Sequence, residues 1–138
     1  MLIFQFNKEY VGEEIVYRPR IPVRLTKSGI TIEVFALIDS GADRTVIPAA
    51  WADALKLEKG KEIETSGISG SIEGYESWID LIFTDDQGKS EKISRIPVYV
   101  LYEFNDVVIG RNKIFDIFRI TFEKLTNRII FDKMSATD

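Results

Sequence analysis

The stretch Phe35-Ala36-Leu37-Ile38-Asp39-Ser40-Gly41-Ala42-Asp43 decides the expected fold, because an apolar run leads directly into an acid, a small hydroxyl residue and a glycine. The apolar residues Val34–Ile38 predict a strand that is buried on both faces. A carboxylate at the end of such a strand is costly to desolvate unless hydrogen bonds or chemistry hold it there. Taken alone, the stretch leaves two interpretations open: a catalytic aspartate, or a strand that ends in an ordinary Asp-Ser-Gly turn.

Length and composition limit the function classes. The 138 residues fit one domain, and 45% hydrophobic with 12% aromatic content indicates a folded globule. The net charge of −4 and the absence of a basic run argue against a nucleic-acid partner. No apolar stretch approaches the ~20 residues that span a bilayer, so no membrane partner is expected. The first residues lack the basic segment of a secretion signal, and the expected location is the cytoplasm.

The chain contains no His and no Cys. Ser-His and Cys-His nucleophilic sites, disulfides and the usual zinc sites are therefore excluded. The remaining catalytic groups are carboxylates, hydroxyls, lysines or a hard metal held by oxygen ligands. The adjacent acids Asp85-Asp86 could suggest a metal ligand set, but their Gln87-Gly88 context favours an exposed turn. No metal or other cofactor is expected.

Apolar alternation and turn residues predict a mostly-β chain with one or two short helices. Pro97 suggests that its strand lies at an edge or ends there. A helix over Ala49–Leu57 is expected to carry Trp51 and Leu55 on one face, and a second short helix is expected over Asn112–Ile117. The expected strands are Leu2–Phe6, Glu14–Tyr17, Ile21–Leu25, Ile30–Ile38, Tyr75–Thr84, Ile96–Leu101, Val107–Ile109, Arg119–Glu123 and Arg128–Phe131.

The segment Glu62–Tyr75 is rich in glycine and flanked by strand patterns. Gly67, Gly70 and Gly74 predict a hairpin, and Ile68 places an apolar side chain near its tip. The segment is either a loose surface hairpin or a flap that closes over a ligand, since glycine gives mobility and isoleucine gives apolar surface to bury.

Together these landmarks resemble the retropepsin-like aspartic proteases, the single-domain relatives of retroviral protease. The resemblance lies in three segments that follow the family's order: Asp39-Ser40-Gly41-Ala42, Gly67-Ile68-Ser69-Gly70, and Val107-Val108-Ile109-Gly110-Arg111-Asn112. It covers Ile21 to Phe131. We therefore divide the chain into a protease domain over residues 21–138 and a strand-like N-terminal extension over residues 1–20. The sequence leaves the role of the extension open between an edge hairpin or ordinary sheet, an arm that reaches a partner chain, and a pro-segment.

The resemblance implies a closed single-domain β-barrel that works as a homodimer and cleaves peptide or protein substrates. Each chain would contribute one Asp-Ser-Gly, so that two copies of Asp39 form a shared carboxyl dyad. Arg111 would support the loop by pairing with a partly buried Asp43. Position 44 is Arg where viral members often carry an acid, so viral side-chain preferences are not transferred. The implied catalytic residues are Asp39, Ser40 and Gly41, and the implied substrate-binding residues are Ala42, Asp43, Gly67, Ile68, Ser69 and Gly70.

Two other readings of the chain remain. It is either an inactive peptide- or protein-binding module of the same dimeric fold, or an unrelated β-barrel interaction domain in which Asp39 only ends a strand. The oligomeric state separates the second reading from the others, because a monomer cannot assemble the dyad.

Overall fold

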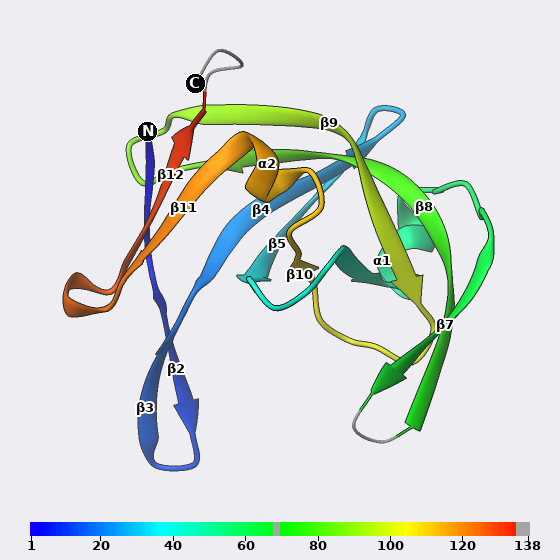
Figure 1. Cartoon of the computed structure of the whole chain (residues 1–138), viewed down its shortest axis with the longest axis horizontal. Helices are drawn as coiled ribbons and strands as arrows, with labels where there is room; N and C mark the ends of the chain where they lie inside the picture. The colour runs from blue at the N-terminus through cyan, green and yellow to red at the C-terminus, as the bar shows by residue number, and fades with distance from the viewer. Residues whose placement is uncertain (68–69, 135–138) are drawn as a thin grey trace.

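The fold is described from a computed structural model, for residues 1–67 and 70–134 (Figure 1). As predicted, most of this part of the chain is strand, with two short α-helices. The helices are α1 (Ala49–Ala54) and α2 (Ile114–Ile117), with a 3-10 turn η1 (Lys124–Thr126). The strands are β1 (Leu2–Gln5), β2 (Asn7–Val11), β3 (Glu14–Arg18), β4 (Arg20–Lys27), β5 (Ile30–Ile38), β6 (Thr45–Pro48), β7 (Glu62–Gly67), β8 (Gly70–Thr84), β9 (Ser90–Leu101), β10 (Val108–Ile109), β11 (Phe118–Glu123) and β12 (Arg128–Lys133).

The main sheet has the strand order β4-β5-β10-β6-β9-β8-β7. Strand β8 also pairs with β4, which closes the strands from β4 to β8 into a ring and leaves β7 outside it. This connection agrees with the predicted closed barrel. The β4–β5 hairpin turns at Ser28 and Gly29, whose φ angles of 49° and 81° suit a tight two-residue turn.

A second sheet, in the order β1-β12-β11, joins the two ends of the chain. Its buried Phe118 and Phe131 pack against Phe83 of β8, with ring centroids 6.1 and 5.2 Å apart, and Phe4 packs against Phe131 at 5.2 Å. The first strand therefore shares one core with the strands after residue 20. The predicted boundary between residues 20 and 21 stays a prediction, but Leu2 and Phe4 lie inside this common core.

Strand β5 is buried on one face only, so the prediction of burial on both faces was wrong. Ala36 and Ile38 point into the core, whereas Phe35 between them is 57% exposed. Successive side chains of a strand point to opposite faces, and the outer face of β5 meets solvent. A continuous apolar run therefore does not show that both faces are buried.

Strand β9 runs from Ser90 to Leu101 between β6 and β8, so both the edge position and the strand-end position inferred from Pro97 were wrong. The reason is local. Pairing with β6 begins at Val98, so Pro97 lies just before the point where the neighbouring strand starts. A missing N–H costs little at such a position.

Both helices are shorter than predicted. Helix α1 ends at Ala54, and Lys56 follows with a φ angle of 55°, outside the helical region. Ala52 and Leu55 face the core, while Trp51 is 39% exposed, so Trp51 does not share the buried face with Leu55. No helix within the described ranges has the length and apolar character needed to cross a membrane.

The turn at Asp85 forms as predicted, but this aspartate is buried rather than exposed, with 7% of its surface accessible. Its carboxylate accepts N–H donors from Ile3 at 3.1 Å and from Gln87 and Lys89 at 2.9 Å. Burial raises the pKa of Asp85, but these three backbone donors outweigh it and the net pKa is lowered. Asp85 thus fastens β1 to the β8–β9 turn.

Candidate active site

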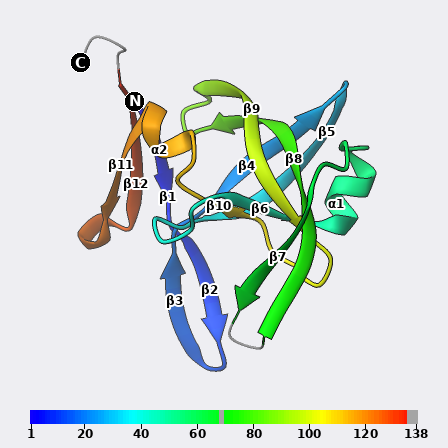
Figure 2. The same ribbon diagram turned by 45° about the vertical axis from the view of Figure 1, so that its right-hand side comes forward.

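The loop that carries Asp39 spans the end of β10. The chain leaves β5 at Ile38, turns through residues 39–44 and returns as β6. Strand β10 lies between these two strands, parallel to β5 and antiparallel to β6 (Figure 2). The two apolar segments that the sequence singled out are therefore adjacent in space, with Val108 opposite both Leu37 and Val46.

Backbone hydrogen bonds hold Asp39 at this point. Its N–H donates to the carbonyl of Ile109 at 3.0 Å, and its own carbonyl accepts the N–H of Ala42 at 3.2 Å. One carboxylate oxygen, Oδ1, accepts the N–H of Gly41 at 2.8 Å. The side chain is half-buried. The carboxylate is thus oriented by the loop yet remains accessible to water or a ligand.

Ser40 and Gly41 are exposed at the apex of the loop. A Cβ atom at position 41 would lie 3.2 Å from Oδ1 of Asp39, which is tighter than an ordinary contact. Glycine therefore keeps the space beside the carboxylate open, as expected for a position that a second molecule approaches.

The predicted pair between Arg111 and Asp43 is present. Both side chains are exposed, Arg111 to 51% and Asp43 to 84%, so the expectation of a partly buried Asp43 is wrong for the single chain. The backbone makes further connections: the N–H groups of Arg111 and Asn112 donate to the carbonyls of Ala42 and Asp43, each at 2.9 Å. These two bonds join the Asp39 loop to the segment after β10.

The sequence did not reveal the role of Thr45. Its side chain is fully buried, and its hydroxyl accepts the N–H of Gly110 at 3.2 Å. A Cβ atom at Gly110 would come within 2.4 Å of the Arg44 backbone, so only glycine permits this approach. The one signal in the sequence was a hydroxyl residue opening an otherwise apolar strand.

Arg44, the position that departs from the viral pattern, reaches away from the loop. Its guanidinium lies 3.4 Å from the carboxylate of Glu76 on β8 and 4.8 Å from the ring centre of Tyr99 on β9. The cation therefore stands over an aromatic face and beside an acid, both favourable surroundings. Arg44 links the loop to the strand that continues into the β7–β8 hairpin.

The β7–β8 hairpin projects from the main sheet in both ribbon views (Figures 1 and 2). Its strands pair as far as Gly67 and Gly70, and Gly70 has a φ angle of 116° that favours glycine. Ile68 and Ser69, predicted to touch substrate, lie outside the described residues.

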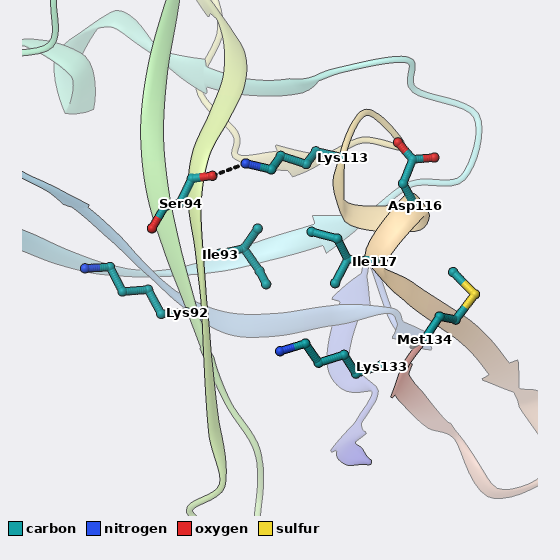
Figure 3. Close-up of a pocket in the computed structure, with 8 residues that line it drawn as sticks. All are labelled: Lys92, Ile93, Ser94, Lys113, Asp116, Ile117, Lys133 and Met134. Carbon is teal, nitrogen blue, oxygen red and sulfur yellow. Dashed lines mark hydrogen bonds between the residues drawn. The ribbon is translucent and has the colours of Figure 1, made fainter. Parts of the chain in front are cut away.

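A hollow lies away from this loop, between β9 on one side and α2 with the end of β12 on the other (Figure 3). It measures about 770 Å³ and is lined by Lys92, Ile93, Ser94, Lys113, Asp116, Ile117, Lys133 and Met134. None of these residues belongs to the predicted site, so the hollow is not the predicted substrate cleft. Across residues 1–67 and 70–134, no group of three acidic side chains is arranged to hold a metal ion.

Comparison with known proteins assigns the class. The profile of a family described as aspartyl protease matches residues 21–112, and the chain belongs to this family. Its fold is similar to that of a retropepsin-like aspartic protease from Rickettsia conorii, with a TM-score of 0.57, 13% identity, and coverage of 94% of this chain and 88% of that one. The EIAV protease complexed with the inhibitor HBY-793 also matches, with a TM-score of 0.48, 22% identity, and coverage of 78% and 92%. No curated protein matches the chain.

Proposed function

We propose that this protein is an aspartic endopeptidase that acts as a homodimer. The observation that supports this most strongly is the state of Asp39: a half-buried carboxylate at the end of a core strand, oriented by Gly41 and still open to a ligand. The chain has one Asp-Ser-Gly, and aspartic protease chemistry needs two carboxyl groups. A second copy placed on a two-fold axis supplies the second group, because an isologous contact brings the same residue of both chains together.

The proposed mechanism uses the pair as a unit, as aspartic proteases generally do. Two carboxyls a few ångströms apart cannot both ionise cheaply, so they share one proton. The ionised group takes a proton from a water held between them, while the protonated group polarises the scissile carbonyl. Protons then pass to the leaving amine, and no covalent acyl-enzyme forms.

The other predicted site residues take supporting roles in this proposal. Ser40 hydrogen-bonds across the two-fold axis and holds the two Asp39 loops in place. Ala42 and Asp43 contact the substrate beside the dyad. The β7–β8 hairpin serves as the flap that excludes water and holds the substrate backbone, with Gly67 and Gly70 flanking its tip. The positive φ angle of Gly70 and the projection of this hairpin support that role.

Digestion of a peptide library by the wild type and by Asp39→Asn tests the proposal. We expect the substitution to preserve the fold and the dimer but to lower cleavage by at least about a thousandfold. Asp86→Asn, which changes an exposed turn acid, is the matched control and should cleave like the wild type. Cleavage that survives in Asp39→Asn would remove the catalytic assignment. A folded dimeric wild type that cleaves nothing would instead favour the inactive binding module.

A further inference from the structure

The hairpin formed by β2 and β3 exposes one mainly apolar face, which also carries Lys8. These strands pair with each other in a sheet of their own, from Asn7 opposite Arg18 to Val11 opposite Glu14. Cross-strand partners share a face, so Tyr10 and Ile15 lie on one side beside Tyr17 and its partner Lys8. The ammonium groups of Lys8 and Lys124 lie 5.6 Å and 5.9 Å from the ring centres of Tyr10 and Tyr17. Their exposed fractions are 66%, 47% and 40%. A two-stranded hairpin is marginal in water without packing on one face, so this apolar side is suited to a partner.

The base of this hairpin is fixed beside Asp39. The carbonyl of Pro19 accepts the N–H of Ile38, the residue directly before Asp39, at 2.9 Å. Arg20 extends the anchor, because its guanidinium donates to Asp106 at 2.7 Å and to Glu9 of β2 at 3.0 Å. The hydrogen bond to Asp106, with a further contribution from Glu9, raises the pKa of Arg20 and keeps this partly buried cation charged. The hairpin is therefore positioned relative to the candidate active site.

We propose that the β2–β3 hairpin is a dimerisation arm whose Tyr10, Ile15 and Tyr17 face packs on a second copy of this chain. This inference rests on the proposed function, since it assigns the contact that holds two Asp39 loops together.

The second copy is the partner that geometry favours. A shared dyad would bring the partner's Asp39 to within a few ångströms of this one, and so close to Ile38, the residue whose N–H is bonded to Pro19 at the base of the arm. From that edge, five paired residues at ~3.4 Å each carry the arm ~17 Å outward. Both ribbon views show it standing clear of the main sheet (Figures 1 and 2). By two-fold symmetry each arm lies on the other chain, and two arms bury twice the apolar surface of one.

The first test measures dimer dissociation by sedimentation for the wild type and for Tyr10→Thr/Ile15→Thr. Threonine keeps strand preference while removing apolar area, so the hairpin itself is preserved. We expect the dissociation constant of the dimer to rise about tenfold or more, with cleavage at low enzyme concentration falling in parallel. The variant Tyr10→Phe/Ile15→Val keeps the apolar area, so its dissociation constant and its cleavage at low enzyme concentration should match those of the wild type. Leu125→Thr, which removes a 96% exposed side chain outside the hairpin, is the control and should leave the dimer unchanged.

The second test does not depend on weakening the protein. Because the chain has no cysteine, Glu13→Cys, at the exposed turn of the same hairpin and apart from Tyr10, Ile15 and Tyr17, can carry a single benzophenone label. Photolysis of an equal mixture of ¹⁴N and ¹⁵N protein should give cross-linked peptide pairs of mixed isotope, which only contact between chains produces. Pairs formed only within one chain would overturn the arm.

The outcomes distinguish a failure of the dimerisation arm from a failure of the proposed homodimeric protease. A wild-type dimer that cleaves, with the threonine variant equally dimeric, overturns the arm and leaves the protease intact. An equal weakening by Leu125→Thr overturns a specific role for the arm. A monomeric wild type overturns the shared dyad, and the arm with it.

Discussion

Two aspartates in this protein directly follow a core strand and begin a turn, yet their surroundings differ. Asp85 follows β8, is 7% exposed and accepts backbone N–H groups from three residues. Asp39 follows β5, is half-buried and accepts one backbone N–H, from Gly41. A carboxylate whose lone pairs are filled by its own backbone is structural, whereas one held in place but left with free acceptor capacity is available for chemistry.

The largest effect is expected when the charge of Asp39 is removed, because this residue is assigned to catalysis and Asp85 to stability. Asp39→Asn should lower cleavage by at least about a thousandfold while changing the free energy of unfolding by less than about 1 kcal/mol, because few contacts depend on its charge. Urea denaturation alongside a peptide assay measures both quantities. A variant that unfolds easily would show that Asp39 is structural after all.

Asp85→Ala should have the opposite effect. Removing the carboxylate leaves backbone donors of β1 and of the β8–β9 turn without a partner, which should cost about 1–3 kcal/mol of stability. Cleavage by the folded fraction should be unchanged. Asp86→Ala in the same turn is the control, since that side chain is exposed. An unchanged unfolding free energy for Asp85→Ala would contradict the fastening role.

The pH dependence of stability gives a second test of the structural role of Asp85. The pKa of Asp85 is lowered in the folded protein, so its contribution is fully present above the ordinary value near 3.8 and is lost as pH falls from there through the lowered value. The difference in unfolding free energy between the wild type and Asp85→Asn should therefore be constant from pH 5 to 7, on the order of 1 kcal/mol. It should shrink at still lower pH. A difference that grows on acidification would contradict this assignment.

The smallest effect is expected at the ion pair beside the Asp39 loop. Arg111→Ala removes the partner of Asp43, but both side chains are exposed, so the loss of stability should stay below about 1 kcal/mol. The two backbone bonds from Arg111 and Asn112 remain in the variant. If Arg111→Ala lowers the melting temperature more at protein concentrations that favour the dimer than at those that favour the monomer, dimerisation buries the pair.

The sequence predicted the parts of the site that depend on local pattern. Asp39-Ser40-Gly41 and the segment through Gly110 and Arg111 were identified because apolar runs ending in these residues have a local signature. The burial of Asp85 was not predictable in this way, since its donor at Ile3 lies 82 positions away and depends on how β1 packs. The hydroxyl of Thr45, 65 positions from its donor Gly110, was missed for the same reason. The exposure of Phe35 was missed because an apolar run does not show which face of a strand meets solvent.

Subunit mixing tests the shared dyad most directly. Wild-type and Asp39→Asn chains are dissociated, mixed in defined ratios at constant total concentration, and allowed to reassociate before cleavage is assayed. If each site needs an aspartate from both chains, activity should follow the square of the wild-type fraction, so an equal mixture retains about one quarter of the wild-type rate. Activity that falls in direct proportion to the wild-type fraction, leaving about one half, would show that one chain carries a complete site and would contradict the account.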